Sequence, residues 1–248
     1  MRAFRSLAWV LAKLALRDPL AVFFTLALPP ALVALFGLAF GNAPIPLQAG
    51  RGSMDHQLPA IAAWVFAMTG LFSVPMALLG RRDAGTLRRF QVTPLRPATY
   101  LAADVVVHLG QALLGLALLF AVGMGLFGAH GGGTAAAVLG AALLGALAFL
   151  ALGYALAALL PSARAVPVVG NLLAVPMLFL SGATAPLEVM PAAVQRAAGL
   201  NPLHHAVALL RGAWFGDPWP GLAASAAVVA GLLVGAAVFA AWRFRWEP

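Results

Sequence analysis

The sequence contains no cysteine, a single lysine and few charged residues of either sign. Without cysteine there is no disulfide bond, no thiolate metal site and no cysteine nucleophile. Charged residues make up only 9% of the 248 residues, whereas a soluble domain carries about 25%. A water-soluble surface cannot be built from so few charges, so the composition excludes an ordinary soluble domain.

Motifs for nucleotide and metal chemistry are absent as well. There is no G-x-x-x-x-G-K-[ST] phosphate loop, and the sole lysine, Lys13, is followed by Leu14. There is no H-E-x-x-H, and the five histidines lack the carboxylate spacing of a metal site. We therefore expect no catalytic residue, no metal and no cofactor in this chain, which is not predicted to be an enzyme.

What the sequence has in abundance is apolar residues, which make up 63% of the chain. Apolar runs of the roughly 20 residues that cross a bilayer recur along its whole length. We predict a single all-α integral membrane domain over residues 1–248 with six transmembrane helices. The predicted spans are residues 19–40, 58–79, 98–127, 135–160, 165–182 and 221–242.

The first 18 residues resemble a signal peptide only superficially. Lys13 interrupts the apolar stretch, which leads to Arg17-Asp18-Pro19 rather than to a small-residue cleavage site. Apolar residues recur at helical spacing with basic residues around the rest of the circumference, so we predict an amphipathic helix on the membrane surface. Pro29-Pro30 in the following span predicts a kink, either beside a pathway or merely accommodated by neighbouring helices.

The basic residues decide the predicted orientation. With the N-terminus inside, 12 of the 15 lie on the cytoplasmic side: Arg2, Arg5, Lys13, Arg17, Arg81, Arg82, Arg88, Arg89, Arg96, Arg164, Arg243 and Arg245. An excess of Lys and Arg marks the cytoplasmic side of a membrane protein. We therefore expect a multi-pass protein of the bacterial cytoplasmic (inner) membrane with both termini in the cytoplasm. The net charge of +8 then reflects topology and not nucleic-acid binding.

The segment from Ala183 to Pro220, on the predicted outer side, is neither a simple loop nor a span. Pro191 lies at one predicted helix start, and Asn201 with Pro202 forms a cap and first residue of another over residues 202–215. The second helix is too short to cross and contains Arg211. We predict two short outer-leaflet helices before the last span.

The segment "RRDAGTLRRFQVTPLRP", residues 81–97, holds five of the 15 basic residues on the predicted cytoplasmic side. Asp83 is a good N-cap for a short helix, and Thr93 before Pro94 should end it. About nine helical residues would span only about 13 Å. Such a helix, tethered between two spans, is suited to transmit force from a cytoplasmic partner.

This segment resembles the Arg-Glu-x-Gly-Thr-Leu-x-x-Leu-x-x-Thr/Ser-Pro cytoplasmic motif of ABC-2 type permeases, the membrane subunits of a class of ATP-binding-cassette exporters. "FLSGATAPLEVMPAAVQRAAGLNPLHHAVALLRG" is similar to the family's segment after the fifth span, and "RDPLAVFFTLALPPALVALFGLAFG" to its surface helix and first span. The resemblance covers nearly the whole chain. One departure is Asp83, where the family usually has Glu.

The resemblance implies a permease that works with an ABC ATPase subunit and with a second permease copy, as a homodimer, or a paralogue. ATP and Mg would be bound by the ATPase, and membrane lipids surround the permease. Residues carried over to the ATPase-coupling helix are Arg82, Asp83, Gly85, Thr86, Leu87, Phe90, Thr93 and Pro94. Those carried over to the outer re-entrant segment are Ser181, Gly182, Pro186, Pro191, Asn201, Pro202 and Arg211.

Polar groups also occur within the third predicted span. Asp104, His108 and Gln111 follow one another at i, i+4 and i+7, hence on one helix face. Ionisable groups inside a membrane are costly and often functional, which would suit a proton relay or substrate contact. An interfacial pair that steadies helix packing is the competing interpretation, because Asp104 lies close to the predicted cytoplasmic end.

The family resemblance implies that the first and fifth spans line the path between protomers. The candidate residues there, which could equally be core or lipid-facing, are Phe23, Phe24, Pro29, Pro30, Phe36, Phe40 and Phe179. The leading functional prediction is an exporter of a hydrophobic or amphiphilic substrate (drug, lipid or glycoconjugate). The alternatives are an ion-gradient-driven secondary transporter that uses Asp104 and His108, and a non-transporting membrane scaffold.

Overall fold

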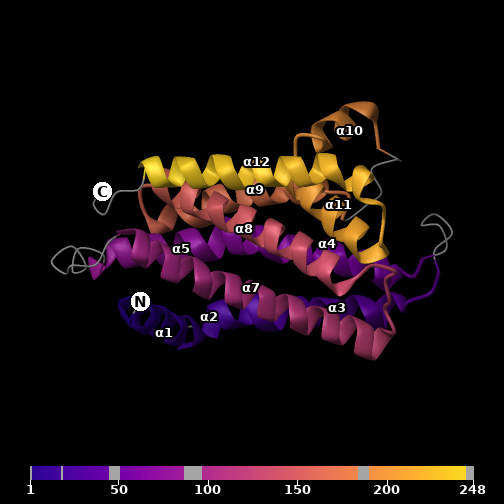
Figure 1. Cartoon of the computed structure of the whole chain (residues 1–248), viewed down its shortest axis with the longest axis horizontal. Helices are drawn as coiled ribbons and strands as arrows, with labels where there is room; N and C mark the ends of the chain where they lie inside the picture. Colours follow the sequence, from indigo (N-terminus) through magenta and orange to yellow (C-terminus); the bar gives the residue numbers. More distant parts are fainter. Residues whose placement is uncertain (1, 18, 45–50, 87–96, 184–189, 244–248) are drawn as a thin grey trace.

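The computed structural model describes residues 2–17, 19–44, 51–86, 97–183 and 190–243. Over these residues the chain is helical and forms no strand, which confirms the predicted all-α class. The long helices run along the long axis of the molecule as one bundle (Figure 1). The first helix, α1, and the end of the last, α12, lie at the same end of that bundle (Figure 1).

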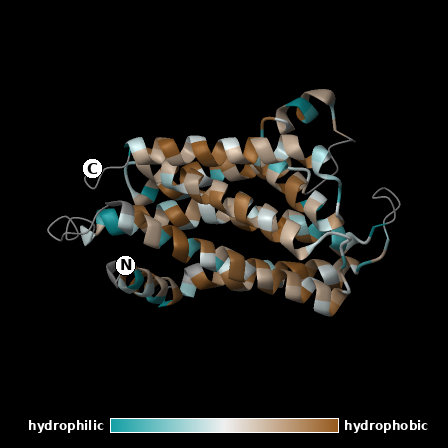
Figure 2. Ribbon diagram, viewed as in Figure 1, coloured by the Kyte–Doolittle hydropathy of each residue, from teal (hydrophilic) through white to brown (hydrophobic). Residues whose placement is uncertain are grey.

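All six predicted apolar segments are helical. Four helices are long and apolar enough to cross a membrane: Ser53–Asp83, Thr99–Phe127, Ala135–Leu159 and Trp219–Arg243. Two further apolar helices, Thr25–Phe40 and Ala163–Phe179, are shorter than these and correspond to the first and fifth predicted spans. Hydrophilic residues gather mainly toward the two ends of the bundle (Figure 2), as expected if the middle faces lipid.

The first half of the chain forms one side of the bundle. The amphipathic helix α1 (Arg2–Arg17) is followed by α2 (Pro19–Val22), the π-helical segment η1 (Phe23–Ala27) and α3 (Leu28–Phe40). The second span consists of α4 (Ser53–Met68), the π-helical segment η3 (Thr69–Ser73) and α5 (Val74–Asp83). The third is α7 (Pro97–Phe127), which packs against α1 and α3.

The second half covers the other side. It contains α8 (Ala135–Leu159), the 3-10 turn η4 (Ala163–Ala165), α9 (Val166–Phe179), α10 (Ala192–Ala198), α11 (Pro202–Phe215) and α12 (Trp219–Arg243). Helix α12 lies along α8, and α11 packs against α4, α8 and α12. Helix α10 projects from the bundle (Figure 1), with Ala198 as its one buried residue.

Both π-helical segments lie immediately before prolines. A proline lacks the N–H that would bond to the carbonyl four residues earlier, and its ring clashes with that carbonyl. The wider π turn accommodates this: the N–H of Leu28 bonds to the carbonyl of Phe23, and that of Val74 to Thr69. Pro29 and Pro75 follow directly. The prolines at which a kink was predicted, Pro29-Pro30, thus follow a π segment that ends at Ala27.

Two glycines let the second span and α8 touch through their backbones. A Cβ built on Gly70 would lie 2.1 Å from the carbonyl oxygen of Phe149, and one on Gly153 would lie 2.5 Å from that of Gly70. No larger residue fits either position without a helix shift. By contrast, a Cβ at Gly231 or Gly235, which form a G-x-x-x-G pattern, meets nothing within 4 Å. That pattern therefore makes no close packing contact with the described chain.

The apolar core has two main parts. One lies among α4, α7, α8 and α11 and includes Phe66, Phe149 and Leu203. The other joins α1, α5, α7 and α8 at the opposite end. There Leu7 and Leu11 of α1 are buried, at 8% and 3% exposure. The amphipathic helix thus places its apolar face on the bundle itself.

Candidate functional site

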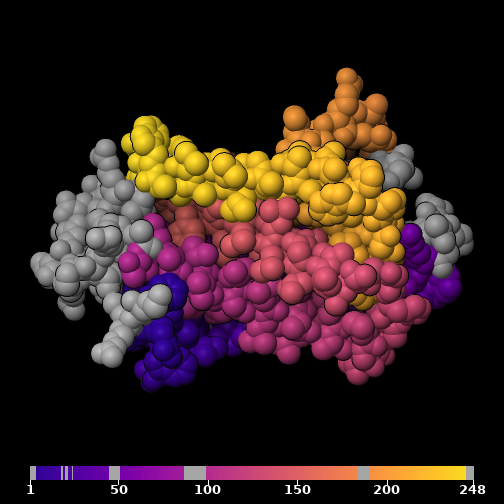
Figure 3. All heavy atoms as spheres, in the orientation of Figure 1, coloured from indigo at the N-terminus to yellow at the C-terminus, as the bar shows by residue number. Residues whose placement is uncertain are grey.

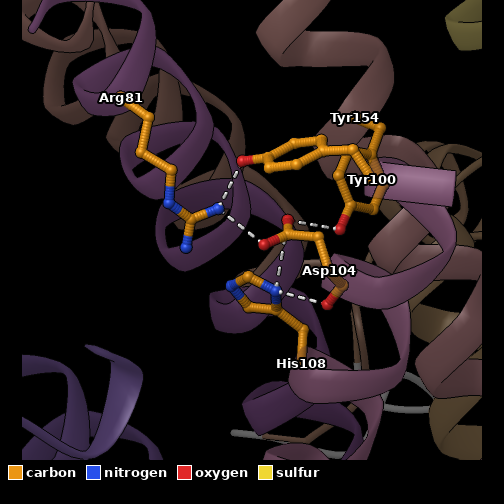
Figure 4. Close-up of polar contacts among 5 residues, drawn as sticks. All are labelled: Arg81, Tyr100, Asp104, His108 and Tyr154. Carbon is orange, nitrogen blue, oxygen red and sulfur yellow. Dashed lines mark hydrogen bonds and ion pairs between the residues drawn. The ribbon is translucent and has the colours of Figure 1, made fainter. Parts of the chain in front are cut away.

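The most polar buried cluster centres on Asp104, whose side chain is completely buried in α7 (Figure 4). Arg81, near the end of α5, donates through Nη1 to Asp104 Oδ1 at 2.6 Å. The same nitrogen donates to the hydroxyl oxygen of Tyr100 at 2.8 Å. The ion pair therefore joins α5 to α7 inside the protein, and the arginine side chain retains 19% exposure.

Two further groups complete the environment of this carboxylate. The Tyr154 hydroxyl on α8 donates to Asp104 Oδ2 at 2.8 Å. His108 Nδ1 lies 3.0 Å from the backbone carbonyl of Asp104 and 3.5 Å from Oδ2. Because a carbonyl oxygen only accepts, this geometry requires a hydrogen on His108 Nδ1. The Asp104 carboxylate thus contacts Arg81 of α5, Tyr154 of α8 and, at a longer distance, His108 of its own helix α7.

Helical spacing relates three of the five residues of this cluster. Tyr100, Asp104 and His108 occupy successive turns of α7, at i, i+4 and i+8, and so share one face. The sequence predicted the Asp104–His108 pair. Gln111, predicted on the same face, instead lines a groove between α1 and α7. Tyr100, Arg81 and Tyr154 were missed. Tyr100 lies one turn before Asp104 on the same helix, so spacing could have identified it. Neither apolar spacing nor charge counting pairs Arg81 or Tyr154 with a residue on another helix.

The contacts of this cluster join three helices, α5, α7 and α8. The completely buried carboxylate of Asp104 accepts from the Arg81 guanidinium of α5 and from the Tyr154 hydroxyl of α8. Removing one partner of a buried ion pair leaves an uncompensated charge, which costs several kcal/mol, about 3–5. Among the described residues no group of three or more His, Cys, Asp or Glu could hold a metal ion. The arrangement suits a rigid connection among α5, α7 and α8.

The next two residues connect α5 to the turn after α8. Arg82 Nη2 donates to the carbonyl oxygens of Leu160 and Pro161, at 2.9 and 2.6 Å. Asp83 Oδ2 accepts from the backbone N–H of Ala163 at 3.0 Å. Arg81, Arg82 and Asp83 therefore fasten the end of α5 in two directions, toward α7 and toward the α8–α9 connection.

The predicted N-cap role of Asp83 is wrong. Asp83 is the last residue of α5, which continues four residues beyond the predicted end of the second span. It continues because the bundle supplies partners for both arginines, so their charges do not end the helix. Gly85, in the left-handed region at φ +69°, then turns the chain, and Thr86 follows. The predicted coupling residues Leu87, Phe90, Thr93 and Pro94 lie outside the described residues.

The predicted outer re-entrant segment contains a second polar cluster, where α9 ends and α11 begins. Asn201 caps α11 by accepting from the N–H of Leu203 at 3.0 Å, and donates to the carbonyl of Met177 at 2.7 Å. His204 Nδ1 lies 3.2 Å from the carbonyl oxygen of Ser181. Arg211 Nη2 donates to the carbonyl of Gly182 at 3.5 Å.

These contacts tie α11 to the end of α9. The helix bounds match the prediction of residues 202–215, and Pro191 is the N-cap of α10. Pro186 lies outside the described residues. Helix α11 is part of the core and does not lie on a membrane surface. Five of its residues are 2% exposed or less: Leu203, Ala206, Val207, Leu209 and Leu210.

A third polar cluster surrounds Asp55, at the end of the bundle where α11 lies. Asp55 is 6% exposed. Asp55 Oδ1 accepts from Asn42 Nδ2 at 3.1 Å and from the N–H of His130 at 2.9 Å. Its Oδ2 accepts from the N–H of Gly52 at 3.2 Å. One carboxylate thus joins the end of α3, the start of α4 and the turn after α7. The sequence did not indicate this cluster, because two of the three partners, Asn42 and His130, are 13 and 75 residues away.

The aromatic residues of the first and fifth helices face outward. Phe23, Phe40 and Phe179 are 50%, 62% and 60% exposed, whereas Phe36 packs partly against the core. Pro29 is buried in α3 and Pro30 is half-buried. The side chain of Phe24 lies outside the described residues. Two apolar helix faces, on α3 and α9, are therefore uncovered in the single chain.

Comparison with known proteins adds a family assignment. Residues 2–215 match the family model described as ABC-2 type transporter. The matched range runs from the first described residue to the last residue of α11. A search of curated proteins gave no match.

Proposed function

Because the chain belongs to the ABC-2 type transporter family and is therefore a permease component of an ABC transporter, we propose that it exports its substrate with energy from a separate ATPase subunit. The observation that carries this proposal is that the end of α5 is bonded to two different parts of the bundle. Arg81 binds Asp104 of α7, while Arg82 and Asp83 bind the α8–α9 connection. A displacement of the segment after Gly85 would therefore move α5, α7 and α8 together.

In this proposal the ATPase docks on the residues that follow Gly85, over the motif that ends at Pro94. Helix α5 ends at Asp83, so few residues separate the docked segment from the Arg81 ion pair. A helix is stiff along its axis, and charged contacts at its end resist sliding. ATP binding would move the docked segment, and α5, α7 and α8 would move with it.

The proposed substrate is a hydrophobic or amphiphilic molecule: a drug, lipid or glycoconjugate. Uncovered apolar faces on α3 and α9 support this, since a second permease copy placed against them would enclose an apolar path. The exposed side chains on these faces include Leu35, Leu38, Phe40, Val168, Leu172 and Phe179. The proposed assembly is thus two permease chains, as a homodimer or with a paralogue, and two ATPase subunits in the bacterial inner membrane.

The proposed orientation places the end of the bundle with α1 and the end of α12 in the cytoplasm. Arg81, Arg82, Arg164 and Arg243 belong to the ends of α5, η4 and α12 at that end. Basic residues mark the cytoplasmic side. The opposite end carries the Asp55 cluster and the Asn201 cluster.

A proton-driven secondary transporter is the competing function, and the Asp104 cluster argues against it. A relay needs a carboxylate that gains and loses a proton during the cycle. Asp104 has no exposure, and its two carboxylate oxygens are engaged by Arg81 and Tyr154, so it has no contact with solvent from which a proton could arrive.

The coupling proposal is tested with two glycines of matched backbone geometry. Gly85 and Gly128 have φ of +69° and +62°, and a Cβ at either one meets nothing within 4 Å. Replacement by tryptophan costs each about 1–2 kcal/mol of left-handed strain, but only Gly85→Trp obstructs the proposed docking segment. Each variant is co-reconstituted with its ATPase, and we measure permease-dependent ATP hydrolysis and export of a fluorescent amphiphile.

We expect Gly85→Trp to abolish both activities while the variant still inserts, and Gly128→Trp to retain them. Equal behaviour of the two variants would contradict docking after Gly85. Export by the permease alone in vesicles under a proton gradient, without any ATPase, would overturn the proposed function itself.

A further inference from the structure

An open groove of about 960 Å³ lies between α1 and α7, with Leu26 of η1 at one side. In Figure 3, α1 (indigo) packs along the side of α7 at the edge of the molecule. Small-molecule sites usually measure about 300–1,000 Å³, so this groove lies at the upper end of that range. None of the clusters described above uses it.

The lining is apolar with one cation. Of the 13 lining residues only Arg5, Ser6 and Gln111 are polar, and none is acidic. Arg5 has no hydrogen-bond or ion-pair partner within the part of the chain that the structure describes. The exposed apolar side chains of Trp9, Val106 and Leu114 open the groove outward, at 63%, 50% and 49% exposure. An occupant must therefore be apolar along its length and anionic at one end.

The dimensions fit one lipid chain. The lining residues of α1 run from Phe4 to Leu16, a helical length of about 18 Å. One leaflet contributes about half of a hydrocarbon core that is about 30 Å thick, or about 15 Å. An acyl chain laid along α1 would run the length of the groove, and the phosphate at its head would meet Arg5.

We propose that this groove binds one anionic phospholipid as a resident ligand, with an acyl chain between α1 and α7 and the phosphate on Arg5. Bound there, the lipid extends the packing of Leu7 and Leu11 and fixes α1 on the bundle. The proposal concerns the permease chain alone. It is measured without ATPase or transport, so its failure and the failure of the export function are distinguishable.

The structure supplies matched controls. Arg17 is an exposed arginine on the same helix that does not line the groove. Gly110 lines the groove, and a Cβ there meets nothing within 4 Å, so Gly110→Leu fills the groove without a backbone clash. Gly125 is equally open on the same helix α7 but lies outside the groove.

The experiment measures lipid retained by purified full-length protein. Each variant is exchanged into micelles with equal dioleoylphosphatidylglycerol and dioleoylphosphatidylcholine, and bound lipid is counted by native mass spectrometry. Arg5→Gln should lower phosphatidylglycerol retention about five-fold, the effect of about 1 kcal/mol per basic residue at an anionic lipid surface, whereas Arg17→Gln should not. Gly110→Leu should reduce retention of both lipids, and Gly125→Leu neither.

A second measurement is made on the unaltered protein, with one variant used only to assign the signal. Phosphatidylglycerol brominated on its acyl chains should quench the fluorescence of Trp9, identified as the component lost in Trp9→Phe, more than brominated phosphatidylcholine does. Equal losses from Arg5→Gln and Arg17→Gln would indicate diffuse surface attraction and overturn the proposal. So would absence of preferential quenching, or a shift from dimer to monomer in Gly110→Leu, which would make the groove a contact between two copies.

Discussion

Removing Arg81 should destabilise the protein more than neutralising Asp104, and doing both should restore part of the loss. Arg81→Met leaves the completely buried carboxylate of Asp104 with Tyr154 and His108 as its partners, which costs about 3–5 kcal/mol. In Asp104→Asn the amide oxygen can still accept from Arg81, and the amide nitrogen can donate to the Tyr154 oxygen. Because Arg81 is partly exposed, with 19% of its side chain accessible, this change costs about 1.5–3 kcal/mol.

The double variant Arg81→Met with Asp104→Asn contains no buried charge at this position. It should therefore be more stable than Arg81→Met alone, although each single change lowers stability. We would follow unfolding by tryptophan fluorescence during SDS titration in mixed micelles, with all four proteins at the same lipid content. Additive losses, or a double variant less stable than Arg81→Met, would refute the argument that the carboxylate is a buried anion held by this arginine.

Two further predictions concern packing and the opposite end of the bundle. Gly153→Leu should lower the thermal midpoint and disrupt the contact between α8 and the second span, because its Cβ would lie 2.5 Å from the carbonyl oxygen of Gly70. Gly231→Leu should not lower it, because a Cβ at Gly231 meets nothing within 4 Å. Equal midpoints for the two variants would contradict this prediction. Asp55→Asn places an amide nitrogen opposite a buried N–H donor and should lower the free energy of unfolding by about 1–3 kcal/mol. Asp217→Asn removes one partner of an exposed 3.9 Å ion pair and should lower it by under about 1 kcal/mol. Both changes are measured by the same unfolding titration.

Local patterns in the sequence predicted most of the helices. The α11 bounds followed from the Asn201 cap and Pro202, both local signals, and the apolar runs predicted the four long apolar helices and the two shorter ones. The amphipathic spacing of residues 4–15 predicted α1, but not that its apolar face would pack on the bundle. Leu14 follows Leu7 and Leu11 at helical spacing but is 52% exposed, because α1 packs on the bundle mainly against α7.

The polar clusters could be predicted only in part. Asp104 and His108 share a helix, so their spacing identified them. Arg81 looked like the start of a basic loop, because two arginines normally end a membrane span. Its inclusion in α5 depends on Asp104 and Tyr100, which are 23 and 19 residues away. The contact between Gly70 and Gly153 depends on helix placement, which a single sequence does not encode locally.

The burial of α11 has a consequence for how the protein is made. At 14 residues the helix is about 21 Å long, too short to be held across a bilayer of about 30 Å by itself. Its neighbours α4 and α8 are synthesised before it, but α12 is synthesised after it. During synthesis α11 must therefore wait for the last span to insert before its packing is complete. A chain truncated before residue 219 would lack α12, so one side of α11 would be uncovered. Membrane proteases should degrade such a product.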